Sequence, residues 1–292
     1  GDGKTDFVTV RNTGGGSGGQ VTWFTSFQDG FPTSTTEWGI ASDQFVPADY
    51  DGDGKDDFAI FRPGATGGFY IVQSSNAVIR IERFGAAGDD ASVVGDYNGD
   101  GEDDIAVYRS GATTGDQSSW FYRPRANTSF IQVDWGQGGD FPAPGDYDGD
   151  GKYDFMVQRD DSGGVAGRFW LKTSAGVVSS QFFGLKDDSV VPGDYDDDGK
   201  TDIAVVRNDA GQIRWTFEPS GTAGVTEVTD VWGDAATDFI TQGDYDGDGR
   251  TDYAVWRPGS PGTFYIMTVS RSISSRVWGL TGDYPVANYN QH

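Results

Sequence analysis

Nine-residue segments rich in Asp and Gly recur along the chain and carry its clearest chemical signal. Five intact copies begin at Asp49, Asp96, Asp146, Asp194 and Asp244, and the first reads DYDGDGKDD. Carboxylates at positions one, three, five and nine can converge on one hard cation together with the backbone carbonyl of position seven, and glycine at position six permits the sharp turn. Without a cation, clustered carboxylates repel one another. The segments therefore predict calcium sites, and each loop is named below by its first residue.

The predicted ligands follow from this template, with position seven contributing its carbonyl. They are Asp49, Asp51, Asp53, Lys55 and Asp57; Asp96, Asn98, Asp100, Glu102 and Asp104; Asp146, Asp148, Asp150, Lys152 and Asp154; Asp194, Asp196, Asp198, Lys200 and Asp202; and Asp244, Asp246, Asp248, Arg250 and Asp252. A sixth loop is split between the termini, where Asp2 and Asp6 would be joined by Asn288 and Asn290. Because two Asn replace carboxylates there, the sequence predicts five calcium ions and leaves the sixth site open.

The opening spacing matches an EF-hand loop, but the bidentate Glu at position twelve is absent and Ile60 stands there in the first copy. A solvated Asp/Gly turn is the simpler alternative for any single copy. Five copies on one template favour calcium.

Composition narrows the class of protein. The net charge of −24 is concentrated in the loops, and without a basic stripe nucleic acid is not an expected partner. No apolar run reaches membrane-spanning length, so no membrane insertion is expected. There is no Cys for a disulfide framework or thiol catalysis. Since the first residues fall inside a repeat, a processed or trimmed start is expected.

The repeat length and its contents predict the fold. Loop starts follow one another at intervals of 44 to 50 residues, which is typical of a repeat architecture. The repeat around the Asp49 loop holds four strand-like segments, 44–48, 58–62, 69–72 and 78–84. The second is continuously apolar, as in a strand buried on both faces, and the fourth alternates. We therefore predict an all-β fold, a six-bladed β-propeller of four-stranded antiparallel blades forming one domain over residues 1–292, with repeats starting near 1, 49, 96, 146, 194 and 244.

The first segment of each repeat is expected to be the innermost strand. It carries small residues before the loop and tolerates proline, which belongs on an edge strand because it cannot donate to the ladder. The prolines concerned are Pro47, Pro142, Pro144, Pro192 and Pro285.

The loop between two strands, followed by a Phe-Gly or Trp-Gly pair at the end of each repeat, resembles the FG-GAP/VCBS repeats of integrin α-subunit propellers and many secreted bacterial proteins. The pairs begin at Trp38, Phe84, Trp135, Phe183, Trp232 and Trp278. The resemblance covers the whole chain and implies calcium in the hairpin between the first and second strands of each blade. Integrin propellers have seven blades, whereas six repeats are counted here.

Two further side-chain patterns repeat. An Arg lies thirteen residues after each loop start and an Asp six residues before it, and we expect buried ion pairs that lock each blade to its neighbour rather than a ring of anion-binding arginines. The pattern comprises Arg11, Arg62, Arg109, Arg159, Arg207 and Arg257 with Asp43, Asp90, Asp140, Asp188 and Asp238. Aromatic residues mark position two of each loop and the third strand; burial between blades is expected, with sugar stacking on the third-strand aromatics as the alternative.

Catalysis has little support, because the single His is the last residue and excludes His-dependent nucleophile systems. The C-terminal segment 284–289 matches an inner strand and is expected to complete the first blade of its own chain, with exchange between chains and head-to-tail filaments as the alternative. We expect an extracellular or cell-surface, non-enzymatic structural or adhesive module whose partners are calcium and a glycan, a protein ligand or copies of itself. A lectin is the first alternative and a polysaccharide-acting enzyme the second.

Overall fold

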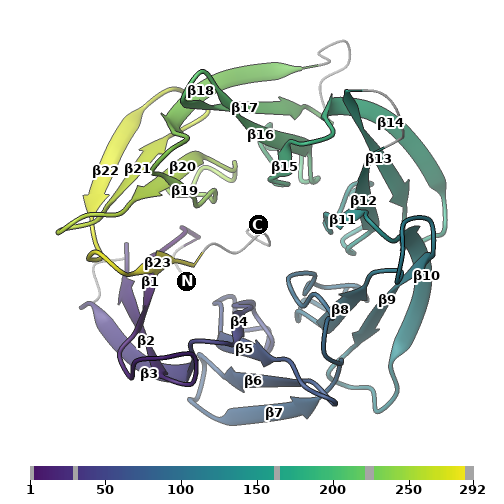
Figure 1. Ribbon diagram of the computed structural model, residues 1–292, viewed down its shortest axis with the longest axis horizontal. Coiled ribbons are helices and arrows are strands. Elements are labelled where there is room, and N and C mark those ends of the chain that lie inside the picture. Colours follow the sequence, from purple (N-terminus) through teal and green to yellow (C-terminus); the bar gives the residue numbers. More distant parts are fainter. Residues whose placement is uncertain (1–2, 29–31, 161–164, 221–226, 287–292) are drawn as a thin grey trace. The chain divides into compact units, whose positions relative to one another are not determined.

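The computed structural model describes residues 3–28, 32–160, 165–220 and 227–286, and these residues form strands and turns with no helix. Six antiparallel sheets are the blades of a six-bladed β-propeller (Figure 1). The chain comprises two compact units, residues 43–192 and residues 1–42 with 193–292. The predicted fold class is therefore confirmed, and the assignment of all residues to one domain stays a prediction.

The sheets are formed from consecutive strands, with one exception at the termini. Three sheets contain β4 (Gln44–Phe45), β5 (Phe58–Arg62), β6 (Gly68–Val72) and β7 (Ile79–Arg83); β8 (Ile105–Arg109), β9 (Gln117–Arg123) and β10 (Ile131–Gln137); and β11 (Phe141–Pro142), β12 (Phe155–Asp160), β13 (Ala166–Lys172) and β14 (Val178–Leu185). The next two contain β15 (Ser189–Val190), β16 (Ile203–Asp209), β17 (Gln212–Glu218) and β18 (Val228–Asp234); and β19 (Phe239–Ile240), β20 (Tyr253–Arg257), β21 (Thr263–Met267) and β22 (Ile273–Val277). The last has the order β23 (Tyr284–Pro285), β1 (Phe7–Asn12), β2 (Gln20–Ser26) and β3 (Ser34–Ile40).

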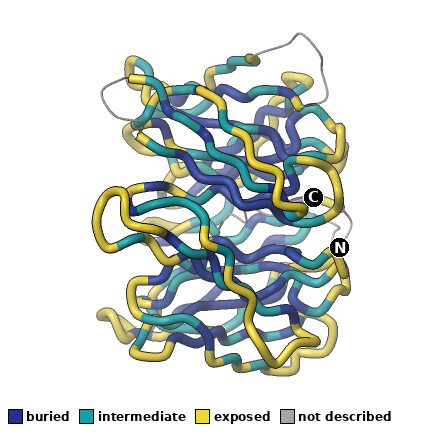
Figure 2. The backbone as a smooth tube through the Cα atoms, turned by 90° about the vertical axis from the view of Figure 1, so that its right-hand side faces the viewer, coloured by how far each residue is buried: buried dark blue, intermediate teal, exposed yellow. Residues whose placement is uncertain are grey.

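Burial follows the strand patterns expected from the sequence. The central residues of β5 are buried without alternation, whereas β7 alternates between exposed and half-buried residues. In Figure 2, buried residues follow the strands and exposed residues gather in the connections. A core between the first two sheets of residues 43–192 includes Tyr50, Phe61, Ile71 and Val107. Successive blades in this unit therefore share one apolar interface.

The inner strands are very short, and their pairing resumes at the base of each loop. In the sheet of β8 to β10 the inner segment makes only isolated bridges, Asp90 with Tyr108 and Gly95 with Asp104. Bridges in the same place join Ala48 to Asp57 and Gly145 to Asp154. Each bridge pairs the residue before a loop with position nine, so the sheet holds the two ends of each loop together.

The C-terminal strand completes the first blade of its own chain. Val10 of β1 pairs with Tyr284 of β23, and Thr9 pairs with Pro285. The Val286 amide donates to the Val8 carbonyl at 3.1 Å. The predicted completion of the first blade by the C-terminal strand is confirmed, and Pro285 lies on the inner strand as expected for a residue that cannot donate to the ladder.

Candidate metal centres

The first Asp of each loop organises the loop backbone. In the Asp49 loop, Oδ1 accepts the Gly52 amide and Oδ2 accepts the Gly54 amide, each at 2.7 Å. Both glycines have φ between +74° and +77°, a region that favours glycine. The Asp146 loop repeats the arrangement. Position one therefore folds the loop in addition to offering a metal ligand.

Position nine is a buried carboxylate in every intact loop. Asp57 is 1% exposed and Asp154 is 0% exposed. One oxygen of each accepts a backbone amide from the hairpin between the third and fourth strands: Ser74 donates to Asp57 Oδ1 and Ser174 donates to Asp154 Oδ1, both at 2.7 Å. Ser220 does the same for Asp202. This hairpin therefore forms a second wall of the site.

The hairpin serines were missed by the sequence reasoning. Ser74 Oγ donates to Asp53 at 2.9 Å and Ser174 Oγ donates to Asp150 at 2.6 Å, so each bonds position five as well as position nine. The signal available in the sequence is a Ser at the second residue after the third strand, as at Ser74, Ser174 and Ser220. Because the third strands and the turns before them differ in length, its distance from the loop varies between repeats.

Burial raises the pKa of the position-nine carboxylates. The pKa of Asp57 rises to about 7, mainly because desolvation penalises its charged form. The hydrogen bond from the Ser74 amide lowers this pKa, whereas repulsion from Asp51 and Asp49 raises it. Desolvation also raises the pKa of Asp252 to about 7 and that of Asp154 to about 6. A loop without a cation therefore holds protons near neutral pH, whereas a divalent cation would favour the charged form.

Four loops bring three carboxylate oxygens within 4.8 Å of one another. The groups that could hold a metal ion are Asp49, Asp51 and Asp53; Asp146, Asp148 and Asp154; Asp194, Asp196 and Asp202; and Asp244, Asp246 and Asp248. In addition, Asp51 Oδ1, Asp57 Oδ2 and Asp252 Oδ1 are buried and make no hydrogen bond. A buried acceptor without a donor is costly, and a hard cation is the partner that carboxylate oxygens prefer. The residues present therefore fit calcium.

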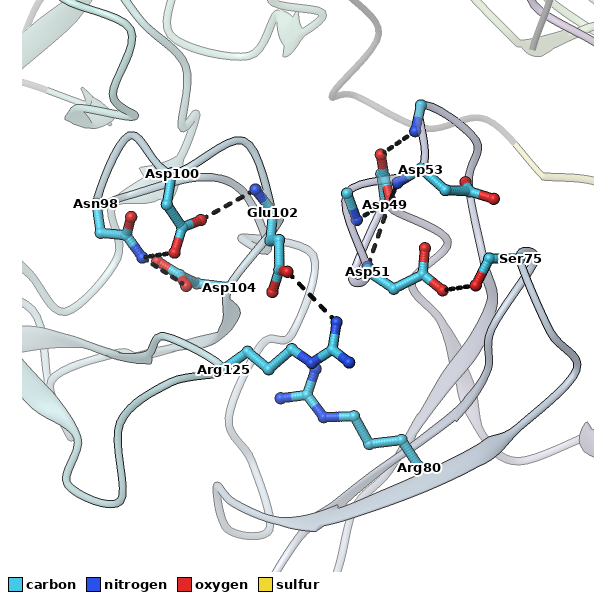
Figure 3. Close-up of polar contacts among 12 residues, drawn as sticks. Asp49, Asp51, Asp53, Ser75, Arg80, Asn98, Asp100, Glu102, Asp104 and Arg125 are labelled. Atoms are coloured by element: carbon cyan, nitrogen blue, oxygen red, sulfur yellow. Dashed lines mark hydrogen bonds and ion pairs between the residues drawn. The ribbon is translucent and has the colours of Figure 1, made fainter.

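The Asp96 loop differs from the other intact loops. The Asn98 amide nitrogen lies between two carboxylates, donating to Asp100 Oδ2 at 3.0 Å and to Asp104 Oδ1 at 3.4 Å (Figure 3). Here an amide donor takes the place that a cation would occupy, and rotating the amide would present its oxygen instead. A calcium site at this loop stays a prediction.

The split loop lies largely outside the described residues. Asp2, Asn288 and Asn290 are among the residues that the structure does not describe. Asp6 is described, and its Oδ1 accepts the Gln28 amide at 2.8 Å. Position nine of the split loop is thus bound as in the intact loops, while the site as a whole stays a prediction.

Successive loops within each unit are joined by hydrogen bonds. The position-one carbonyl accepts the position-eight amide of the following loop: Asp103 donates to Asp49 and Tyr153 donates to Asp96, each at 2.7 Å. Thr251 donates to Asp194 and Thr5 to Asp244, each at 2.6 Å. A Cβ at Gly95 would lie 2.2 Å from the Tyr153 ring. The small residues before the loops therefore make room for position eight of the next loop.

Three of the predicted Arg–Asp pairs form, but each lies within one blade and does not lock it to its neighbour, because the Asp precedes the first strand and the Arg lies on the second strand of the same sheet. Arg62 donates through Nε and Nη2 to Asp43 at 2.7 Å, and Arg159 does the same to Asp140. Arg257 likewise binds Asp238. These aspartates are buried while the arginines stay partly exposed. Fork-shaped pairing to a carboxylate is the geometry that Arg favours.

Two partners differ from the expected pattern. Arg109 pairs with Asp89 and not with Asp90, and Arg11 pairs with Asp283. The reason is the turn that precedes the inner strand. Asp89 Oδ2 accepts the Ala86 amide three residues earlier, as Asp140 Oδ2 accepts the amide of Gln137. This turn fixes the position of the Asp that pairs with the Arg, and the distance of the turn from the loop varies by a residue between blades.

The recurring aromatic residues are packed as expected at position two of the loops. The hydroxyl groups of Tyr50, Tyr97 and Tyr245 donate to carbonyls four residues earlier at 2.7 to 2.8 Å. On the third strand, Trp23 and Trp215 are buried at 1% exposure. The remaining third-strand aromatics, Tyr70, Phe121, Trp170 and Tyr265, are half-buried beneath arginine guanidinium groups.

Comparison with known families assigns one of the repeats. Residues 43–77 match the model of the FG-GAP repeat. The match includes Asp43, the Asp49 loop, β5 and β6, so with the six-bladed fold it is consistent with an FG-GAP propeller. No curated protein matches the chain significantly. In the part of the chain that the structure describes, no helix has the length and hydrophobicity to cross a membrane.

Proposed function

We propose that this protein is a calcium-stabilised, non-enzymatic β-propeller that acts outside the cell as a structural or adhesive module. The observation that carries the proposal is the set of buried carboxylate oxygens in the loops that have no hydrogen-bond donor, at Asp51, Asp57 and Asp252. FG-GAP repeats are generally found in extracellular, non-enzymatic propellers, and the match to such a repeat agrees with this role. Calcium is abundant outside cells, where even weak sites fill.

The residues assigned to calcium are the carboxylates of positions one, three, five and nine and the position-seven carbonyl in the five intact loops. Calcium would supply positive charge that offsets the repulsion among these carboxylates. The hairpin amides would keep the position-nine carboxylates oriented. The function of the metal would be to stiffen the loops that join successive blades.

Chelation tests this proposal. Each site that binds only the folded state adds about 2.7 kcal/mol when calcium is at one hundred times its Kd. Several such sites would raise the melting temperature by far more than a few degrees. Melting curves should be recorded with 1 mM calcium and with EGTA, with magnesium as the control cation. The same melting temperature in calcium and in EGTA would refute the metal assignment.

A second candidate function, a lectin, is supported by a cavity of about 440 Å³. It lies between the sheet of β17 and β18 and the sheet of β20 and β21, and its lining includes Trp232, Asp238, Arg257 and Tyr265. Aromatic faces with a few polar groups in a cavity of this size suit a small polar ligand such as a sugar. Binding on a glycan array, lost in a Tyr265→Ala variant, would support the lectin.

Assembly by exchange of β23 is a separate alternative. The same pairing of β23 with β1 would be kept if β23 came from another copy, because the contacts are local. Light scattering and negative-stain microscopy in calcium distinguish the two arrangements. A monomer supports self-closure, whereas filaments would show that copies of the chain are partners.

A further inference from the structure

One face of the sheet of β4 to β7 carries polar hydrogen-bond donors toward the sheet of β8 to β10. In the sheet of β4 to β7, Ile71 pairs with Arg80, and alternation places Gln73, Arg80 and Glu82 on the same face. Ile71 is packed in a core with Val107 of β8, so this is the face that meets the sheet of β8 to β10. Both sheets belong to the same compact unit.

Two buried donors on this face have no acceptor. Arg80 donates through Nε to Glu82 Oε1 at 2.9 Å, while its Nη1 is buried and makes no hydrogen bond. Gln73 is 5% exposed, and its Nε2 also has no hydrogen-bond partner. Leaving a buried donor unpaired costs free energy, most of all for a charged group. A ligand that accepts hydrogen bonds would remove this cost.

Arginine and glutamate side chains lie together in the same region. Glu82 is shared between Arg80 and Arg123, whose Nη2 donates to it at 2.6 Å. Arg125 contacts Glu102 at 3.4 Å, a long distance for a charged hydrogen bond. Three arginines therefore share two glutamates, with the carboxylates of the Asp49 and Asp96 loops beside them, and guanidinium donors remain for a further acceptor. Figure 3 shows the side chains of Arg80 and Arg125 extending toward each other beside the Asp49 and Asp96 loops.

We propose that Gln73, Arg80 and Arg125 form a binding site for one oxyanion group, a carboxylate or a sulfate. A guanidinium fork matches the oxygens of such groups. A charged acceptor suits these donors better than water does, because charge-assisted hydrogen bonds are roughly twice as strong as neutral ones. The Arg125 side chain is 41% exposed, so the group can enter from solvent as a free anion or as part of an acidic polysaccharide. Glu102 is the one predicted calcium ligand that this site contacts. The metal template uses the carbonyl of Glu102, whereas Arg125 contacts its side chain.

The test is anion binding by the full chain in 1 mM calcium. Sodium sulfate is titrated calorimetrically, with sodium chloride at the same ionic strength as the reference. Arg125→Gln removes one charged donor from an exposed side chain, and Arg80→Gln removes the buried one. Arg83→Gln is the matched control, because Arg83 is an exposed residue of the same strand on the opposite face.

We expect sulfate to bind the native chain and to raise its melting temperature beyond the effect of chloride. Arg125→Gln should weaken binding about tenfold, the loss typical of one charged hydrogen bond, and Arg83→Gln should leave it unchanged. If Arg80→Gln impairs folding, Arg125→Gln still decides. No sulfate-specific effect on the native chain, or equal losses in Arg83→Gln and Arg125→Gln, would overturn the proposal. A sulfated oligosaccharide that binds more tightly than both sulfate and its desulfated form would identify a polysaccharide as the source of the anion.

Discussion

The ion pair between Arg159 and Asp140 gives a stability prediction that can be derived from the structure. Asp140 has a side chain 1% exposed and accepts three hydrogen bonds, two from Arg159 at 2.7 Å and one from the Gln137 amide at 2.8 Å. Replacing Arg159 with Met keeps much of the side-chain volume over Trp170 but removes the positive charge. The Asp140 carboxylate would then be buried without its counterion.

Removing one partner of a buried ion pair typically costs about 3–5 kcal/mol of stability. We therefore expect Arg159→Met to lower the free energy of unfolding by about 4 kcal/mol. For a chain of this size, that loss lowers the melting temperature by roughly 7 °C. Arg214→Met is the control, because the ion pair between Arg214 and Asp209 is exposed on both sides and is worth at most about 1 kcal/mol. Both variants should be measured by thermal melting and urea unfolding in calcium.

A double variant separates the charge from the packing. In Arg159→Met with Asp140→Asn, the Asn side chain still accepts the Gln137 amide and no charge is buried. We expect it to recover more than half of the stability lost in Arg159→Met. The reasoning is refuted if Arg159→Met costs no more than Arg214→Met, or if the double variant is as unstable as the single one.

Three further predictions concern the loops. In EGTA the protein should become more stable as the pH falls from 8 to 5.5. The raised pKa of Asp57, about 7, makes the folded state bind more protons than the unfolded state, whose Asp pKa is about 3.9. Melting curves across this range check the prediction, and a melting temperature that decreases as the pH falls would contradict it. Asp53→Ala and Asp100→Ala lie in linked loops, so their effects on calcium affinity should be non-additive by about fivefold, whereas Asp53→Ala and Asp150→Ala in loops that do not follow one another should be additive in calorimetric titrations; equal behaviour of both pairs would argue against coupling. Asn98→Asp should increase calcium affinity at the Asp96 loop, and an unchanged isotherm would show that this loop does not bind calcium.

Much of the metal loop was predictable because its chemistry is local. Position one bonds amides three and five residues later, so one short segment contains both the ligand and the turn that it stabilises. The spacing of Asp49, Asp51 and Asp53 is sufficient to bring their oxygens together. The repeat length then placed the loops on successive blades, and the strand patterns identified the sheets.

The remaining parts of the site depend on turns whose lengths vary. Asp89 was missed as the partner of Arg109 because the turn at Ala86 fixes its place, not the distance to the Asp96 loop. Ser74 and Ser174 were missed because the segments between the loop and the hairpin differ in length. Contacts set by turn geometry leave no constant spacing in the sequence. Such contacts were accessible only from the structure.

The links between loops would give a bound metal a role in joining blades. Position one both folds its own loop and accepts an amide from the next loop, so a disordered loop would weaken two blades. In the unit that contains the termini, Thr5 donates to Asp244 and Gln28 Nε2 donates to the Tyr245 carbonyl at 3.0 Å. The first blade is therefore joined to the sheet of β19 to β22 by the same kind of contact that joins other successive loops. Because β23 pairs with β1 of the same chain, the inner edge of β1 is covered without a second copy.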